Sequence, residues 1–134
     1  MVERFYGTWK LNDSENFDDY LKEVGVLLPM RLMASASKPT LEVKEEAGGM
    51  ISVKASSTFS KVELKFKLGE ECEDNTADGR KAKSTFTYED GKLVQKQAWD
   101  GKTTTLVREI QNGELLTTCE MNGVVSVRKY MKIN

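Results

Sequence analysis

The residues of this sequence that are best suited to chemistry are two arginines and a tyrosine in its C-terminal third. Arg128 and Tyr130 are two positions apart, so they lie on one side of a strand if that segment is extended. Arg108 belongs to an earlier strand pattern. A guanidinium stays charged and presents a planar set of N–H donors to a carboxylate, and a phenol adds a neutral donor. These three side chains could therefore hold an anionic group.

The same pattern also has a simpler interpretation, in which the charges face water. The opposite face of the last strand carries Val125 and Val127, so periodicity alone places Arg128 outside. If its face points inward, the interior also holds Gln95 and Gln97, and a buried unpaired cation costs several kcal/mol. An inward arrangement makes sense only for a cavity that contains water and an anion, and at this point both interpretations stay open.

Groups for covalent or acid–base catalysis are scarce. The sequence has no histidine, no Gly-x-Ser-x-Gly motif and no cluster with metal-ligand spacing, so we expect a protein that is not an enzyme and has no metal or cofactor. Cys72 and Cys119 are far apart in sequence, which favours free thiols over a disulfide framework.

Length and charge restrict the function classes further. A chain of 134 residues fits a single domain, 1–134, that can enclose a small cavity. The net charge of −1 gives no electrostatic reason to bind nucleic acid. The first residues lack a basic region followed by an apolar stretch, and no apolar run approaches the length of a membrane span. We expect a soluble, cytoplasmic protein.

Four turn dipeptides organise the segment 81–133. Asn-Gly and Asp-Gly tolerate the positive φ angles of tight hairpin turns, and here they recur every ten to twelve residues between runs rich in Thr, Val, Leu and aromatic residues. They are Asp90-Gly91, Asp100-Gly101, Asn112-Gly113 and Asn122-Gly123. The pattern predicts five sequential antiparallel strands.

The N-terminal part predicts one strand followed by two short helices. Residues 5–11 alternate as a half-buried strand does. Asn16 is a candidate helix cap, Gly25 ends the first helix, and Pro29 fits the first turn of a second helix that ends near Ala36. Helices this short are marginal in water, so the hairpin 16–36 must pack on another element, such as the open end of a sheet.

Further strands are predicted at residues 40–46, 50–56, 61–68 and 70–73. With the first strand and the C-terminal five, they make about ten strands with a helical insertion after the first. This order favours an all-β fold, an antiparallel up-and-down β-barrel, an arrangement that removes edge strands and can hold one small ligand. A two-sheet sandwich is the alternative.

Several motifs, in order along the whole chain, resemble those of the cytosolic fatty acid-binding proteins. The sequence is more similar to the heart, brain, adipocyte and myelin branch of that family than to the liver branch. The matching segments are Gly7-Thr8-Trp9-Lys10-Leu11, Asn16-Phe17-Asp18-Asp19-Tyr20-Leu21, Lys38-Pro39-Thr40, Ser57-Thr58-Phe59, Phe66-Lys67-Leu68-Gly69-Glu70, Thr76-Ala77-Asp78-Gly79-Arg80, Trp99-Asp100-Gly101-Lys102, Val107-Arg108-Glu109 and Arg128-Lys129-Tyr130.

The resemblance implies a ten-stranded antiparallel up-and-down β-barrel (β-clam) capped by a two-helix lid. It also implies a non-enzymatic carrier that binds one long-chain fatty acid inside this barrel and acts as a monomer. It implies that Arg108, Arg128 and Tyr130 hold the carboxylate, which turns the last strand's Arg-Tyr face inward. Other cavity or portal contacts that it implies are Phe17, Leu21, Pro39, Phe59, Ala77, Asp78, Gln97, Leu106 and Cys119.

Two neighbouring functions share this anchor or fold. A cellular retinoic acid-binding protein would use the same arginines and tyrosine, so it remains the alternative. A structural role in bridging membranes, as in the myelin member, is disfavoured by the net charge of −1. Compared with its relatives, the second helix is more apolar around Leu32, which suggests transient contact with a membrane surface during ligand transfer.

Overall fold

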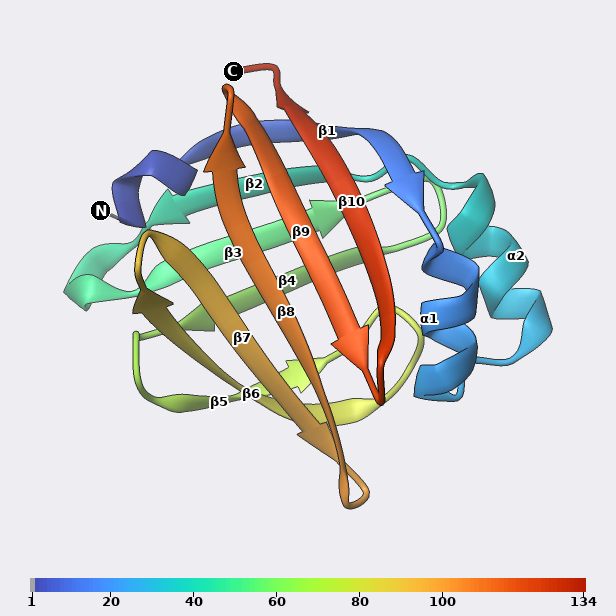
Figure 1. Cartoon of the computed structure of the whole chain (residues 1–134). Coiled ribbons are helices and arrows are strands. Elements are labelled where there is room, and N and C mark those ends of the chain that lie inside the picture. The colour runs from blue at the N-terminus through green and yellow to red at the C-terminus, as the bar shows by residue number, and fades with distance from the viewer. Residues whose placement is uncertain (1) are drawn as a thin grey trace.

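The computed structural model describes residues 2–134 and shows a strongly curved, nearly closed barrel of ten antiparallel strands (Figure 1). The strands are β1 (Gly7–Glu15), β2 (Thr40–Glu45), β3 (Ile51–Ser56), β4 (Lys61–Phe66), β5 (Glu71–Asn75), β6 (Lys81–Glu89), β7 (Lys92–Trp99), β8 (Lys102–Gln111), β9 (Glu114–Met121) and β10 (Val124–Lys132). Their order is β4-β3-β2-β1-β10-β9-β8-β7-β6-β5. The predicted up-and-down barrel is confirmed.

The hydrogen-bonded ladder ends at β4 on one side and at β5 on the other. Side chains bridge this break: the rings of Phe66 on β4 and Phe86 on β6 stack with centroids 3.8 Å apart. The backbone N–H of Gly69 also donates to the carbonyl of Phe86 at 2.7 Å. The barrel is therefore closed there by packing instead of by strand pairing.

The four dipeptide turns form as the sequence predicts. In each of them both residues have positive φ, for example 52° at Asn122 and 84° at Gly123. Two consecutive positive φ angles match the right-handed twist of the flanking strands. β6 to β10 follow one another as a meander, so the prediction for residues 81–133 is confirmed.

Two helices lie between β1 and β2 and cover one end of the barrel (Figure 1). The first, α1 (Phe17–Val24), buries Tyr20, Leu21 and Val24, whereas the second, α2 (Leu28–Ala36), has no buried residue. Gly25 ends α1 with φ of 106°, as expected. The lid is thus firmly packed through α1 and only loosely through α2.

Asn16 does not cap α1 with its side chain, in contrast to the prediction. Its φ is 60°, and its Nδ2 donates to the backbone carbonyl of Val125 on β10 at 2.8 Å. A side chain in this orientation ties the start of the lid to the barrel wall. The capping prediction fails because a long-range partner replaces the local one.

Several predicted strand boundaries also shift. Phe5 is buried in a short 3-10 helix (Val2–Phe5), and its carbonyl accepts a hydrogen bond from Trp9 Nε1 at 2.9 Å, so β1 starts only at Gly7. β4 ends at Phe66 because the chain turns through Gly69, whose φ is 82°, which leaves Leu68 exposed. β5 runs to Asn75 instead of ending at residue 73.

Candidate functional site

The barrel contains an internal cavity of about 340 Å³. Its lining is mixed, with aliphatic and aromatic side chains from β2 to β4 and α1, and polar side chains from β5 and β7 to β10. All of the residues that the sequence suggested as contacts lie on this cavity: Phe17, Leu21, Pro39, Phe59, Ala77, Asp78, Gln97, Leu106, Arg108, Cys119, Arg128 and Tyr130.

The two arginines lie in one row across three neighbouring strands. Arg108 on β8 is paired in register with Thr117 on β9, and Thr117 is paired with Arg128 on β10. Side chains directly opposite each other point to the same face of a sheet, so all three point into the cavity. Two strand spacings place the outer Cα atoms about 10 Å apart. Two cationic side chains therefore face the same cavity.

Arg108 is deep in the cavity and only partly satisfied. Its Nη1 donates to Gln95 Oε1 at 2.9 Å, while its buried Nε has no hydrogen-bond partner within residues 2–134. No carboxylate of the described chain forms an ion pair with it. Burial lowers the pKa of this guanidinium, since removal from water disfavours the charged form. An anion in the cavity would supply the counter-charge and the hydrogen-bond acceptor that Arg108 lacks.

Arg128 is buried against the lid. Its Nη1 donates to Ser14 Oγ at 3.0 Å, and its guanidinium carbon lies 3.7 Å from the centroid of the Phe17 ring of α1. It too forms no ion pair in the part of the chain that the structure describes. Tyr130 follows two residues later on the same face, buried but lining the cavity. The simpler interpretation, in which Arg128 is a surface charge that faces water, is wrong.

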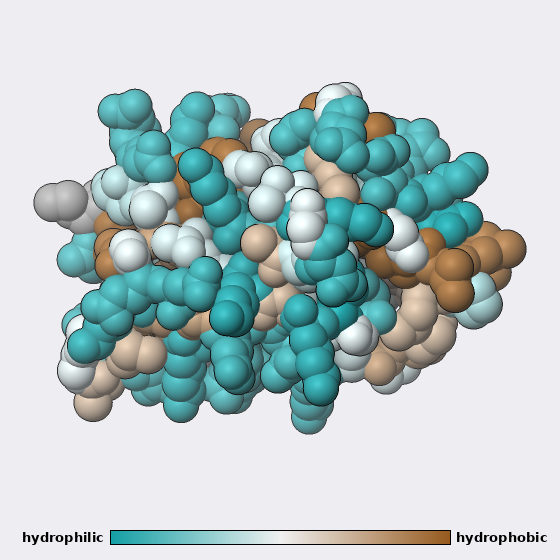
Figure 2. All heavy atoms as spheres, turned by 90° about the horizontal axis from the view of Figure 1, so that it is seen from below, coloured by the Kyte–Doolittle hydropathy of each residue, from teal (hydrophilic) through white to brown (hydrophobic). Residues whose placement is uncertain are grey.

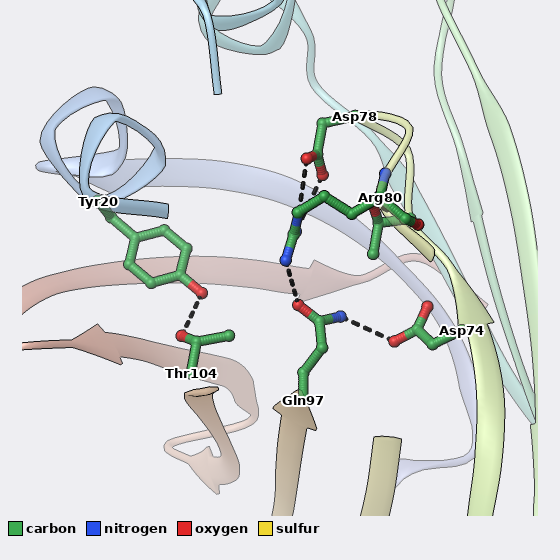
Figure 3. A network of polar contacts seen from close by, with 7 residues as sticks. Tyr20, Asp74, Asp78, Arg80, Gln97 and Thr104 are labelled. Carbon is green, nitrogen blue, oxygen red and sulfur yellow. Dashed lines mark hydrogen bonds and ion pairs between the residues drawn. The ribbon is translucent and has the colours of Figure 1, made fainter. Parts of the chain in front are cut away.

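A second polar network, not foreseen from the sequence, is centred on Asp74 of β5 (Figure 3). Its Oδ2 accepts hydrogen bonds from Ser84 at 2.7 Å, Gln97 at 2.8 Å and Gln95 at 3.2 Å. Because their amide N–H groups point at Asp74, the glutamine oxygens point away from it. Gln95 Oε1 accepts from Arg108, and Gln97 Oε1 accepts from Arg80 at 2.8 Å. The buried carboxylate of Asp74 thus orients the two glutamine side chains whose oxygens accept hydrogen bonds from Arg108 and Arg80.

Asp78 is engaged by Arg80 in a two-pronged ion pair at 2.6 and 2.9 Å. Burial alone would raise the pKa of Asp78, but the hydrogen bonds and charge of Arg80, helped by Thr76, outweigh it, and the pKa is lowered. Arg80 also lies over the Trp99 ring at 4.4 Å. Unlike Arg108, Arg80 therefore has its counter-ion already.

The lid is anchored beside this network (Figure 3). Thr104 Oγ1 donates to the Glu120 carbonyl at 2.7 Å, so at its 2.7 Å contact with Tyr20 the phenol must be the donor. Burial raises the pKa of Tyr20 to about 12. Nearby, burial raises the pKa of Cys119 to about 11 despite the two arginines, which keeps the thiol protonated and inert.

Sequence reasoning missed several residues of this cavity. Asp74 was missed because β5 was expected to end before it, and Arg80 because its contacts with Gln97 and Trp99 join residues that are distant in sequence. Thr117 was missed because a threonine in a strand carries no distinctive signal. Only the register across β8, β9 and β10 shows its position between the arginines.

Comparison with known proteins agrees with this architecture. A model described as "Lipocalin / cytosolic fatty-acid binding protein family" matches residues 6–133. Fatty acid-binding protein 9 of Homo sapiens is 47% identical over 133 residues, 99% of this chain and 100% of that protein. Among solved structures, fatty-acid-binding protein 1 of Echinococcus granulosus is 37% identical, with a TM-score of 0.96 over 98% of this chain and 99% of that one.

A Schistosoma mansoni fatty acid binding protein, solved in complex with arachidonic acid, is 32% identical, with a TM-score of 0.94 over 99% of this chain and 98% of that one. Sequence and structure thus match over nearly the full length of both partners in each comparison. The chain belongs to the lipocalin / cytosolic fatty-acid binding protein family.

Proposed function

We propose that this protein is a non-enzymatic carrier that binds one long-chain fatty acid in its internal cavity, with the carboxylate held by Arg108, Arg128 and Tyr130. The observation that carries the proposal is the pair of guanidiniums that face one cavity without a carboxylate partner among residues 2–134. Arg128 is buried, and the Nε of Arg108 is buried without a hydrogen-bond partner. Unpaired buried cations are costly. A ligand carboxylate relieves that cost and accepts bidentate hydrogen bonds from the planar forks.

The remaining lining suits the hydrocarbon chain of such a ligand. Leu41, Val53, Val62, Leu64 and Leu106 border the cavity and offer aliphatic contacts. Burying about sixteen methylenes at ~0.8 kcal/mol each contributes about 13 kcal/mol before costs. Association costs of about 4 to 15 kcal/mol offset much of this. The chain therefore supplies most of the attraction, and the arginines select the head group and its orientation.

A route into the cavity is favoured at the lid. α2, Phe59 in the β3–β4 turn, and Ala77 with Asp78 in the β5–β6 turn all border the cavity. α2 buries none of its residues, so displacing it sacrifices little packing. We propose that the ligand enters between α2 and these turns.

The outer face of the lid supports a second part of the proposal, brief contact with a membrane surface. Large apolar side chains are exposed there, with Leu27 at 76%, Leu32 at 61% and Leu28 at 55%. Figure 2 shows hydrophobic side chains gathered at the end of the molecule where the helices lie. Within residues 2–134, no helix is long and apolar enough to cross a membrane, so we infer contact with the surface only.

The cellular setting follows from the family. The matching family is described as cytosolic, and we propose a cytoplasmic carrier. Because each chain surrounds its own cavity, binding requires no second copy, which supports a monomer.

The direct test is a calorimetric titration of delipidated protein with oleate and, separately, with all-trans retinoic acid. We expect saturation at one oleate per chain and weak retinoid binding. Tight retinoid binding with weak oleate binding would replace the proposed function by the retinoid alternative. Binding of neither ligand would contradict a carrier of either class.

A further inference from the structure

Thr117 occupies the position midway between the two arginines of the cavity. It is paired in register with Arg108 on one side and with Arg128 on the other, and it borders the cavity. β8, β9 and β10 run side by side in the wall of the barrel (Figure 1). The threonine side chain therefore faces the cavity between the two strands that carry the arginines.

The hydroxyl of Thr117 differs from the other buried hydroxyls of serine and threonine. Ser52, Ser84, Thr104 and Ser126 each donate a hydrogen bond to a protein oxygen. Thr117 is equally buried as a residue, with 5% of its surface exposed, yet its hydroxyl forms no hydrogen bond with residues 2–134. Its oxygen is not among the fully buried atoms that lack a partner, so it is accessible from the cavity. A hydroxyl that faces a cavity and has no protein partner is free to donate to water or to a ligand acceptor.

We propose that Thr117 donates a hydrogen bond to the carboxylate of the bound ligand and is a head-group specificity determinant of this cavity. The inference rests on the proposed function, since it names a further residue of the same site. A carboxylate has two oxygens with about four acceptor sites, so it can accept from both arginines, from Tyr130 and from a hydroxyl between them. Hydrogen bonds to a charged acceptor are stronger than those to a neutral one. Thr117 thus favours a carboxylate over an alcohol head group.

The test compares Thr117→Val with wild type by titration with oleate and with oleyl alcohol. Valine has nearly the same shape but lacks the hydroxyl, so we expect about tenfold weaker oleate binding, the loss of one hydrogen bond to a charged group. Oleyl alcohol binding should change less than threefold. Thr117→Ser keeps the hydroxyl and should restore oleate binding to near the wild-type value.

Thr118→Val is the matched control. Thr118 is the next residue of β9, half-buried on the outer face and absent from the cavity lining, so its variant should bind both ligands as wild type does. A melting curve for each variant verifies folding, and Thr117→Ala carries the same test if Thr117→Val does not fold. Unchanged oleate affinity, or equal weakening for oleate and oleyl alcohol, would overturn the inference, because packing alone would then explain the result.

The failure of this inference can be separated from the failure of the proposed function. If wild type binds oleate and Arg128→Gln weakens binding while Thr117→Val does not, only the role of Thr117 is overturned. If wild-type protein binds no oleate, the carrier function and the role of Thr117 are overturned together.

Discussion

The guanidinium of Arg128 stacks on the ring of Phe17, with its central carbon 3.7 Å from the ring centroid. The contact joins the last strand of the barrel to the first residue of α1. Arg128 is also proposed to bind the ligand carboxylate, so the same side chain contacts both the lid and the head group of the ligand. The buried geometry favours a cation–π interaction worth about 1 to 2 kcal/mol.

We expect Phe17→Leu to lower the free energy of unfolding by about 1 kcal/mol, because leucine fills the space but has no π face. A double-mutant cycle with Arg128→Gln, measured by urea denaturation of the delipidated protein, isolates the pair. The coupling energy should be about 1 kcal/mol and should favour the native pair. Additive effects of the two substitutions would show that the stacking contributes nothing.

Arg108→Met should stabilise the delipidated protein while impairing binding. The arginine is a buried cation without an ion-pair partner, and replacing such a charge with an apolar side chain of similar length is often stabilising. The gain is reduced because Gln95 Oε1 loses its donor. We expect about 1 kcal/mol more stability and at least tenfold weaker oleate binding.

Lys96→Met is the control for this comparison. Lys96 lies on β7, the strand next to that of Arg108, where it is exposed and does not border the cavity. Its effect on both measurements should be small. If Arg108→Met destabilised the delipidated protein, the free charge would not be a cost of folding.

The fold was largely predictable from the sequence because its turns are local. Asn122-Gly123 and its three counterparts determine hairpins without reference to the rest of the chain, and the helix end at Gly25 is of the same kind. Features set by distant partners were not predictable. Asn16 bonds to Val125 instead of capping its helix, and the end of β4 depends on the turn at Gly69.

The site was predictable in composition more than in arrangement. Periodicity cannot decide which face of β10 points inward when Arg128 and Tyr130 lie on one face and valines on the other. Only the resemblance to the fatty acid-binding proteins predicted that the face with Arg128 and Tyr130 points into the cavity. The free hydroxyl of Thr117 becomes visible only when the partners of Ser84, Thr104 and Ser126 are known.

Asp78 should make stability depend on pH in the acid range. Its folded-state pKa is lowered, so the stabilisation is fully present above the unfolded value near 3.8 and is lost as pH falls through the folded value. Asp78→Asn should lose this part of the acid dependence and cost about 1 kcal/mol at neutral pH. Urea denaturation between pH 7 and pH 3 measures both effects. Exposed Asp13→Asn is the control, and acid profiles that coincide for wild type and Asp78→Asn would contradict the assignment.

Cys119 should be alkylated slowly. Burial raises its pKa to about 11, so little thiolate exists at pH 8. In a Cys72→Ser background, iodoacetamide labelling followed by mass spectrometry should show a rate that rises about tenfold per pH unit from pH 7 to 9.5. Cys72, half-buried, should react faster in a Cys119→Ser background. Rapid labelling of Cys119 at pH 7 would show that the arginines stabilise a thiolate.

Transfer of a fluorescent fatty acid from the protein to vesicles should become faster as vesicle concentration rises. This dependence follows if the exposed leucines of the lid contact the membrane before release, whereas diffusion of free ligand would give a constant rate. Leu32→Lys removes one exposed apolar side chain of α2 and should slow transfer several-fold. Phosphatidylcholine vesicles are required, because anionic lipids would attract the new lysine and mask the loss.

Ile133→Lys provides a matched control for this prediction. Ile133 is exposed to a similar extent, 59% against 61% for Leu32, but it is the second-last residue of the chain, and the C-terminus lies away from the helices in Figure 1. If Ile133→Lys transfers ligand at the wild-type rate while Leu32→Lys is slow, the contact is confined to the lid. Equal slowing in both variants would point to a general effect of added charge, and a rate independent of vesicle concentration would remove the membrane step from the transfer mechanism.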